Sequence, residues 1–117
     1  MKKFFLVYII TLLFFMNTAT ANDKMLMKLE AGEVEIQLFP DVAPGHVKRI
    51  KTLAENKEYD GVVFHRVIDG FMAQTGDVKF GNSKNFNADL VGTGGSSLPD
   101  LKAEFSNLPH QRGTLST

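Results

Sequence analysis

The residues best suited to chemistry lie in one run of the sequence, Phe-His-Arg-Val-Ile-Asp-Gly-Phe-Met-Ala-Gln-Thr-Gly-Asp, from Phe64 to Asp77. Two apolar stretches typical of strands carry one arginine and one glutamine, with a Phe-Met pair between them. The run has no nucleophile beside a base, no cluster of metal ligands and no glycine loop that would bind phosphate. It is suited to binding an apolar group and directing hydrogen-bond donors at it. Rotation about an amide bond is one of the few reactions that needs no more.

A hairpin and a helix are predicted ahead of this run. Met25–Leu29 is largely apolar, and Glu33–Leu38 alternates strictly between polar and apolar residues, so the two segments predict a β-hairpin. Pro44 suits the first position of a helix, where its missing N–H costs nothing. Apolar residues then share one face from Gly45 to Asn56, which predicts an amphipathic helix.

The run itself is predicted to form a second pair of strands. Val62–Ile68 is rich in β-branched and aromatic residues, Asp69-Gly70 is a turn signal, and Phe71–Thr75 is a second short strand. Strand alternation places Arg66 on one face and His65 on the other. We therefore expect His65 to be a structural residue whose polar atoms are satisfied, and not a catalytic base.

A long loop follows, in which periodicity is lost between residues 78 and 97. Loops of this length are usually functional in a compact domain. The loop contains Gly92-Thr93-Gly94-Gly95, which is a weak candidate for phosphate binding because no Lys-Ser or Lys-Thr pair follows it. The last residues, Leu115 to Thr117, have the character of a strand that has begun.

Composition excludes several classes of site. The 117 residues suffice for one domain and contain no cysteine, which excludes disulfides, thiolate zinc sites and a cysteine nucleophile. Lys plus Arg and Asp plus Glu each number 13, so no basic surface indicates a nucleic-acid partner. His46 and His110 are isolated in the sequence, and we expect neither a metal site nor a cofactor.

The N-terminus has the pattern of a secretory signal. Two lysines precede an apolar run from Phe4 to Met16, and a small-x-small site follows at Ala19-x-Ala21. The apolar run is shorter than the roughly 20 residues of a spanning helix. We therefore predict a signal peptide over residues 1–21, a folded domain over residues 22–117, export to a periplasm, and no stable membrane insertion after cleavage.

Phe64–Ile68, followed by Gly70–Asp77, resembles the signature of the cyclophilin-type peptidyl-prolyl cis-trans isomerases. Four other segments resemble that family in the same order, namely Ala43-Pro44, Tyr59-Asp60-Gly61, Gly92–Gly95 and Arg112–Ser116. The resemblance covers nearly all of residues 22–117 and is closest to the bacterial exported branch. It implies an antiparallel β-barrel with capping helices, of which Gly45–Asn56 would be the first.

The resemblance also assigns roles to individual residues. It implies that Arg66 and Gln74 are catalytic, and that the substrate is bound by Phe71, Met72, Gly92, Thr93 and Gly94. The implied reaction is rotation of X–Pro bonds in exported polypeptides, by a monomer. Without the resemblance, an arginine on a strand would more often lie on a solvated face, and a Phe-Met pair would more often be core.

The family barrel continues beyond the point that Thr117 matches. Its later strands and second capping helix have no counterpart in this sequence, so the fold class expected here is mainly β, an incomplete cyclophilin-like barrel. Unpaired strand edges favour aggregation, so residues 22–117 made alone should be poorly soluble and have little activity. Two other functions stay open: a proline-peptide binding module without turnover, and a small barrel that carries an apolar ligand.

Overall fold

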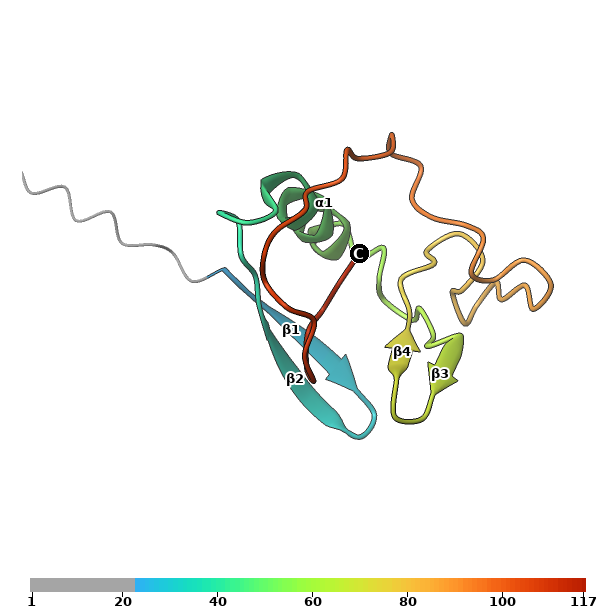
Figure 1. Cartoon of the computed structure of the whole chain (residues 1–117). Coiled ribbons are helices and arrows are strands. Elements are labelled where there is room, and N and C mark those ends of the chain that lie inside the picture. Colours follow the sequence, from blue (N-terminus) through green and yellow to red (C-terminus); the bar gives the residue numbers. More distant parts are fainter. Residues whose placement is uncertain (1–22) are drawn as a thin grey trace, which may run out of the picture.

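The computed structural model of the chain describes residues 23–117, which form two β-hairpins, one helix and long connections (Figure 1). The elements are, in order, β1 (Lys24–Leu29), β2 (Gly32–Gln37), α1 (Pro44–Glu55), β3 (Arg66–Ile68) and β4 (Met72–Gln74). The predicted signal peptide, residues 1–21, lies outside the described residues. Nowhere in residues 23–117 is there a helix with the length and apolar character that crossing a membrane requires.

The first hairpin forms where the alternation in the sequence predicts it. β1 and β2 pair antiparallel in one register, from Lys24 opposite Gln37 to Leu29 opposite Gly32. The turn requires glycine at position 32, because φ there is +141°, a value that residues with a Cβ rarely adopt. The predicted boundaries agree with the observed ones to within a residue.

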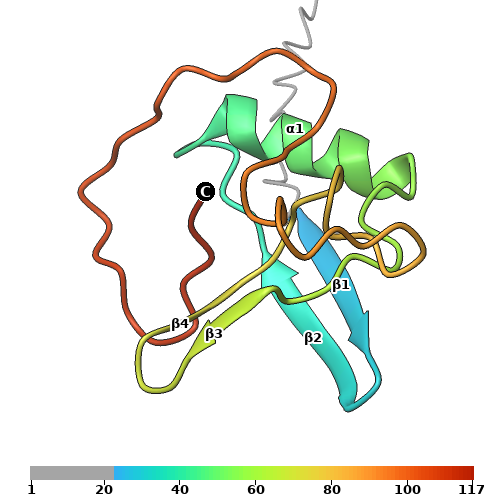
Figure 2. The ribbon, with the colours of Figure 1, turned by 90° about the vertical axis from the view of Figure 1, so that its right-hand side faces the viewer.

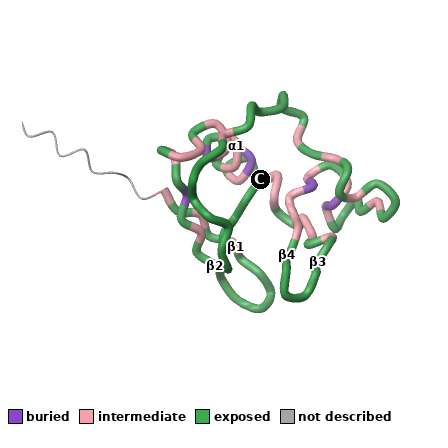
Figure 3. Tube along the Cα trace, in the orientation of Figure 1, coloured by how far each residue is buried: buried purple, intermediate pink, exposed green. Residues whose placement is uncertain are grey.

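The helix also forms where the sequence predicts it. It begins at Pro44, and its predicted apolar face is the buried one, since Val47 and Leu53 are both buried. With Leu38, just after β2, they are the buried apolar residues of the described chain (Figure 3). The core formed by residues 23–117 is therefore small.

The second hairpin is shorter than predicted. Only Arg66–Ile68 and Met72–Gln74 form regular strands, although Val62 makes an isolated bridge with Asn82. The reason is that the backbone N–H of Val63 donates to Gly81 in the following loop, at 2.9 Å, so this part of the chain pairs with the loop and not along β4. The prediction of a continuous strand from Val62 was wrong.

The hairpins form two separate two-stranded sheets, β1–β2 and β3–β4. The regular elements of the described residues are thus four strands and one helix, as expected for a mainly β fold. They do not close a barrel, and the complete barrel stays a prediction. Residues 98–117 contain no helix or strand and follow a wide arc (Figure 2). The strand expected to begin at Leu115 is absent.

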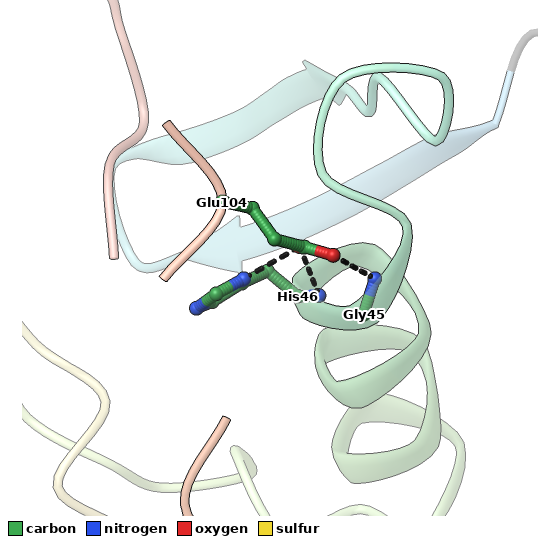
Figure 4. A network of polar contacts seen from close by, with 3 residues as sticks. All are labelled: Gly45, His46 and Glu104. Atoms are coloured by element: carbon green, nitrogen blue, oxygen red, sulfur yellow. Dashed lines mark hydrogen bonds and ion pairs between the residues drawn. The ribbon is translucent and has the colours of Figure 1, made fainter. Parts of the chain in front are cut away.

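A carboxylate from this arc binds the start of α1 (Figure 4). Glu104 accepts hydrogen bonds from the backbone N–H groups of Gly45, at 2.9 Å, and His46, at 3.0 Å, and lies 2.7 Å from Nδ1 of His46. Helices begin with unpaired N–H groups and a partial positive charge, both of which a carboxylate satisfies. Ala43 has no side-chain oxygen to do so. His46 is therefore not isolated, as its sequence context suggested, but part of a helix cap.

Glu104→Gln is expected to lower the free energy of unfolding at neutral pH, with an effect that fades in acid. The side-chain hydrogen bond with His46, followed by the two backbone hydrogen bonds, lowers the pKa of Glu104 below its ordinary value of 4.5. A lowered pKa stabilises the fold above that ordinary value, and the stabilisation is lost as pH falls through the folded-state pKa. Denaturation curves at several pH values measure this. Glu33→Gln is the control, because Glu33 forms only an exposed 3.8 Å ion pair; equal pH dependence in the two variants would contradict the prediction.

Candidate functional site

The arginine and the glutamine of the candidate site lie opposite each other in the second hairpin. Arg66 of β3 pairs with Gln74 of β4 in the antiparallel register, so the two side chains share one face of the hairpin. Nη1 of Arg66 lies 3.5 Å from Oε1 of Gln74, at the outer limit of a hydrogen bond. Both side chains are directed to the same side, and this weak contact leaves the guanidinium free to bind another group.

The two apolar residues of the site differ in position. Met72 pairs with Ile68 and lies two residues before Gln74 on β4, so it shares the face of Arg66 and Gln74. Phe71 lies in the turn before β4, where its N–H donates to Ile68 O at 3.1 Å, and it is 76% exposed. The structure thus brings Arg66, Met72 and Gln74 together and places Phe71 beside them at the end of the hairpin.

The glycine segment is held by Asp77, a residue for which the sequence patterns predicted no role. Asp77 follows β4 by three positions and is only 5% exposed. Its Oδ2 accepts hydrogen bonds from the backbone N–H groups of Gly92, at 2.7 Å, and Gly94, at 3.1 Å. Its Oδ1 accepts two more, from Lys79 at 3.1 Å and Phe80 at 2.9 Å. One carboxylate therefore joins the two ends of the loop that begins at β4.

These hydrogen bonds keep Asp77 charged. Burial has the largest single influence on its pKa and would raise it, but the four N–H groups together outweigh burial and hold the pKa below its ordinary value of 3.8. The carboxylate therefore stabilises the fold at all pH values above 3.8, and this contribution is lost only as pH falls through the lowered pKa.

Thr93 and His65 complete the surroundings of the glycine segment. The hydroxyl of Thr93 donates to Leu90 O at 2.6 Å, so it is used within the loop. The ring of His65 faces Gly92: a Cβ placed on this glycine would lie 3.2 Å from Nε2 of His65, and φ of Gly92 is +93°. His65, adjacent to Arg66, thus links the hairpin to the glycine segment by packing.

The prediction that His65 is satisfied was wrong. Both of its ring nitrogens are buried and have no hydrogen-bond partner among residues 23–117. Strand alternation predicted the face that His65 occupies, opposite Arg66, but not whether its ring nitrogens are paired.

The asparagine-rich part of the loop is ordered by its own side chains. Oδ1 of Asn82 accepts the N–H of Lys84 at 3.0 Å, and Oδ1 of Asn87 accepts the N–H groups of Asp89 and Leu90 at 3.1 and 3.2 Å. Asparagine side chains commonly close turns in this way. The loop that leads to the glycine segment is therefore held in shape by its own side-chain hydrogen bonds.

The structure brings one permanent cation, one amide and two apolar side chains together on the second hairpin, and it joins the glycine segment to that hairpin through Asp77 and His65. Within residues 23–117, no three His, Cys, Asp or Glu side chains are arranged to bind a metal ion. The groups that are present can bind an apolar ring and hydrogen-bond a polypeptide backbone. The role of Asp77 in holding the glycine segment was missed because Gly92 and Gly94 lie 15 and 17 residues away. An acid between a strand and a glycine-rich loop is the signal that could have indicated it.

Comparisons with known proteins agree with this chemistry. The family model for "Cyclophilin type peptidyl-prolyl cis-trans isomerase/CLD" matches residues 24–117. A "Probable peptidyl-prolyl cis-trans isomerase" of Brucella suis is 58% identical over 102 residues, which cover 84% of this chain and 52% of that protein. "Peptidyl-prolyl cis-trans isomerase cyp15" of Rhizopus delemar is 42% identical over 83 residues, covering 69% of this chain and 12% of that protein.

A "Putative peptidyl-prolyl cis-trans isomerase" of Staphylococcus epidermidis is 48% identical over 54 residues, covering 46% of this chain and 27% of that protein. The chain spans about half the length of the Brucella relatives that it matches. No solved structure matches it. Since the family model covers nearly all of the described residues, the chain belongs to the cyclophilin-type peptidyl-prolyl cis-trans isomerase family.

Proposed function

We propose that the full-length protein is a peptidyl-prolyl cis-trans isomerase that accelerates X–Pro bond rotation in exported polypeptides. The observation that carries the proposal is the position of Arg66 opposite Gln74 on a hairpin face shared with Met72, in a chain of this family. The basic and apolar N-terminal pattern with Ala19-x-Ala21 supports export, and the periplasm is the proposed destination.

The reaction explains why such a site suffices. Amide resonance sets a barrier of about 18–20 kcal/mol to rotation, and uncatalysed X–Pro exchange takes tens to hundreds of seconds. In the twisted transition state the nitrogen lone pair is no longer delocalised and can accept a hydrogen bond. A catalyst must favour this state over both planar forms. Arg66 supplies a permanently charged donor, and each ~1.4 kcal/mol of selective stabilisation gives a tenfold rate increase.

The other residues hold the substrate while one side of the bond rotates. Phe71 and Met72 would contact the proline ring, and Gln74 would bind a flanking backbone group. Thr93 would offer its backbone, because its hydroxyl is already bonded to Leu90. Only one side of the bond needs to be held, which leaves the other free to turn.

The proposal is tested by exchange NMR on a proline peptide with the full-length protein. Catalysis should broaden the cis and trans signals of the peptide, or give exchange cross-peaks between them, at protein concentrations far below that of the peptide. An absence of enhanced exchange over the uncatalysed rate would refute it.

Phe71→Ala is expected to raise KM about tenfold or more with little change in stability. Burial of a phenylalanine side chain against a ligand contributes roughly 1.5–3 kcal/mol. Because Phe71 is 76% exposed, its loss should not create a cavity. Val67→Ala is the matched control, as Val67 is 67% exposed in the same hairpin. KM is read from initial isomerisation rates, and equal KM values for the two variants would remove Phe71 from the site.

A further inference from the structure

Asp77 is the one buried charged residue in the described part of the chain. A buried charge is costly unless its hydrogen bonds are complete. Here all of its four partners are backbone N–H groups, and they come from two places, the turn just after β4 and the glycine segment. The arrangement therefore does more than close a local turn, because it fixes a distant segment to the end of the strand that carries Gln74.

The glycines around Asp77 show how closely the chain approaches it. A Cβ on Gly94 would lie 2.5 Å from Oδ1 of Asp77, and a Cβ on Gly81 would lie 2.6 Å from its carbonyl oxygen. Neither position has room for a side chain. The loop backbone is thus packed directly against Asp77 at both positions.

We propose that Asp77 is a positioning residue for substrate selection. Its carboxylate fixes Gly92–Gly94, the segment whose Thr93 backbone is proposed to contact the substrate, relative to the end of the strand that carries Gln74. This inference rests on the proposed isomerase function. Because Asp77 is buried and its hydrogen bonds are all with the backbone, its substitution should affect substrate binding and selection and leave the Arg66-dependent step largely intact.

The test uses Asp77→Asn and Asp77→Glu in the full-length protein. Asparagine keeps the shape but offers one acceptor oxygen, and it places an amide N–H2 against two backbone N–H groups. Glutamate keeps the charge and lengthens the side chain, so it shifts the glycine segment and serves as the second variant if the asparagine protein does not fold. Glu104→Gln is the matched control, because Glu104 also accepts two backbone N–H groups but at the start of α1.

Amide hydrogen exchange and steady-state kinetics give separate readouts. In Asp77→Asn the introduced NH2 group faces one of the two pairs of backbone N–H groups, Gly92 and Gly94 or Lys79 and Phe80. Amide exchange at that pair should accelerate roughly 10- to 100-fold, the range for loss of a hydrogen bond to a charged acceptor. KM should rise roughly tenfold with kcat changed by less than about threefold, which is the kinetic sign of lost binding that is uniform between ground and transition states. Preference among peptides that differ in the residues flanking the X–Pro pair should weaken.

The outcomes are distinguishable. A purely structural role would lower apparent kcat with the folded fraction and leave KM and peptide preference as in Glu104→Gln; that result in either Asp77 variant would overturn the inference while the proposed function stands. If the unmodified protein isomerises no proline peptide, the proposed function fails, and the inference fails with it. Raised KM and weakened preference in a folded Asp77 variant support it.

Discussion

Replacing Arg66 by alanine is expected to lower kcat about 100- to 1,000-fold on a proline peptide, the size of effect seen when one donor aimed at transition-state charge is removed. Stability should barely change. Arg66 is exposed on β3, and among residues 23–117 the only hydrogen bond of its side chain is the 3.5 Å contact with Gln74, so truncating the side chain leaves no buried group unpaired. A surface substitution of this kind usually changes the free energy of unfolding by less than about 0.5 kcal/mol.

The large effect follows from the timing of the hydrogen bond. In either planar form the lone pair of the proline nitrogen is part of the amide resonance, so the nitrogen is a poor acceptor. In the twisted form it can accept a hydrogen bond. A guanidinium placed over that nitrogen therefore stabilises the transition state more than the substrate, which raises kcat and not only affinity. Arg66→Lys keeps the charge but loses the planar array of donors. It should recover part of the rate if charge dominates and little if the guanidinium geometry does.

Exchange NMR or a protease-coupled assay on the full-length protein measures the rate, and peptide titration measures binding. Full activity in Arg66→Ala would remove this residue from the mechanism. The same pair of measurements separates the alternatives. A proline-binding module would show binding but no turnover before any substitution, and a barrel that carries an apolar ligand would bind it equally well in Arg66→Ala.

Local patterns predicted the parts of the fold that depend on local interactions. The alternation of Glu33–Leu38 specified β2, and Pro44 specified the start of α1, because strand faces and helix starts are encoded within a few residues. The end of β3 was predicted and its beginning was not. The N–H of Val63 donates to Gly81, which lies in the following loop and not in the partner strand, so the pattern of the two strands could not indicate where β3 begins.

The same distinction applies to the site. The turn signal at Asp69-Gly70 and the two apolar runs around it predicted a hairpin but not its register. Strands joined by a two-residue turn would set Arg66 opposite Ala73, whereas the observed three-residue turn sets it opposite Gln74. The support behind them is not local: Asp77 binds glycines 15 and 17 residues further on, and Glu104 caps a helix 58 residues before it. Both are acidic residues whose role depends on backbone N–H groups, which every residue except proline carries, so the sequence holds no distinctive partner to search for.

Gly94→Ala is expected to lower the free energy of unfolding by about 3 kcal/mol or more. The new Cβ would lie 2.5 Å from Oδ1 of Asp77, 2.7 Å from Cδ2 of Phe80 and 2.9 Å from Cβ of Lys79. Overpacking alone typically costs about 1–3 kcal/mol. The Asp77 carboxylate cannot move aside freely, because a shift would break hydrogen bonds to a buried charge, which contribute roughly 1.5–3 kcal/mol each.

Gly95→Ala is the matched control, since a Cβ on Gly95 meets nothing within 4 Å. Its effect should stay within about 1 kcal/mol, and it can be slightly stabilising because alanine restricts the unfolded chain. Chemical denaturation of the full-length proteins gives both values. Equal stability of the two variants would show that the loop is not packed on Asp77 as described.

A double-mutant cycle identifies the source of the cost. Combining Gly94→Ala with Asp77→Ala removes the oxygen that the new Cβ meets first, so the cost of the glycine substitution should shrink in that background. It should not vanish, because Phe80 and Lys79 still lie within 3 Å of the new atom. If the changes in unfolding free energy were strictly additive, the carboxylate of Asp77 would be moving away from the new Cβ without cost. In that case the four hydrogen bonds to Asp77 could not fix the glycine segment against the strand of Gln74.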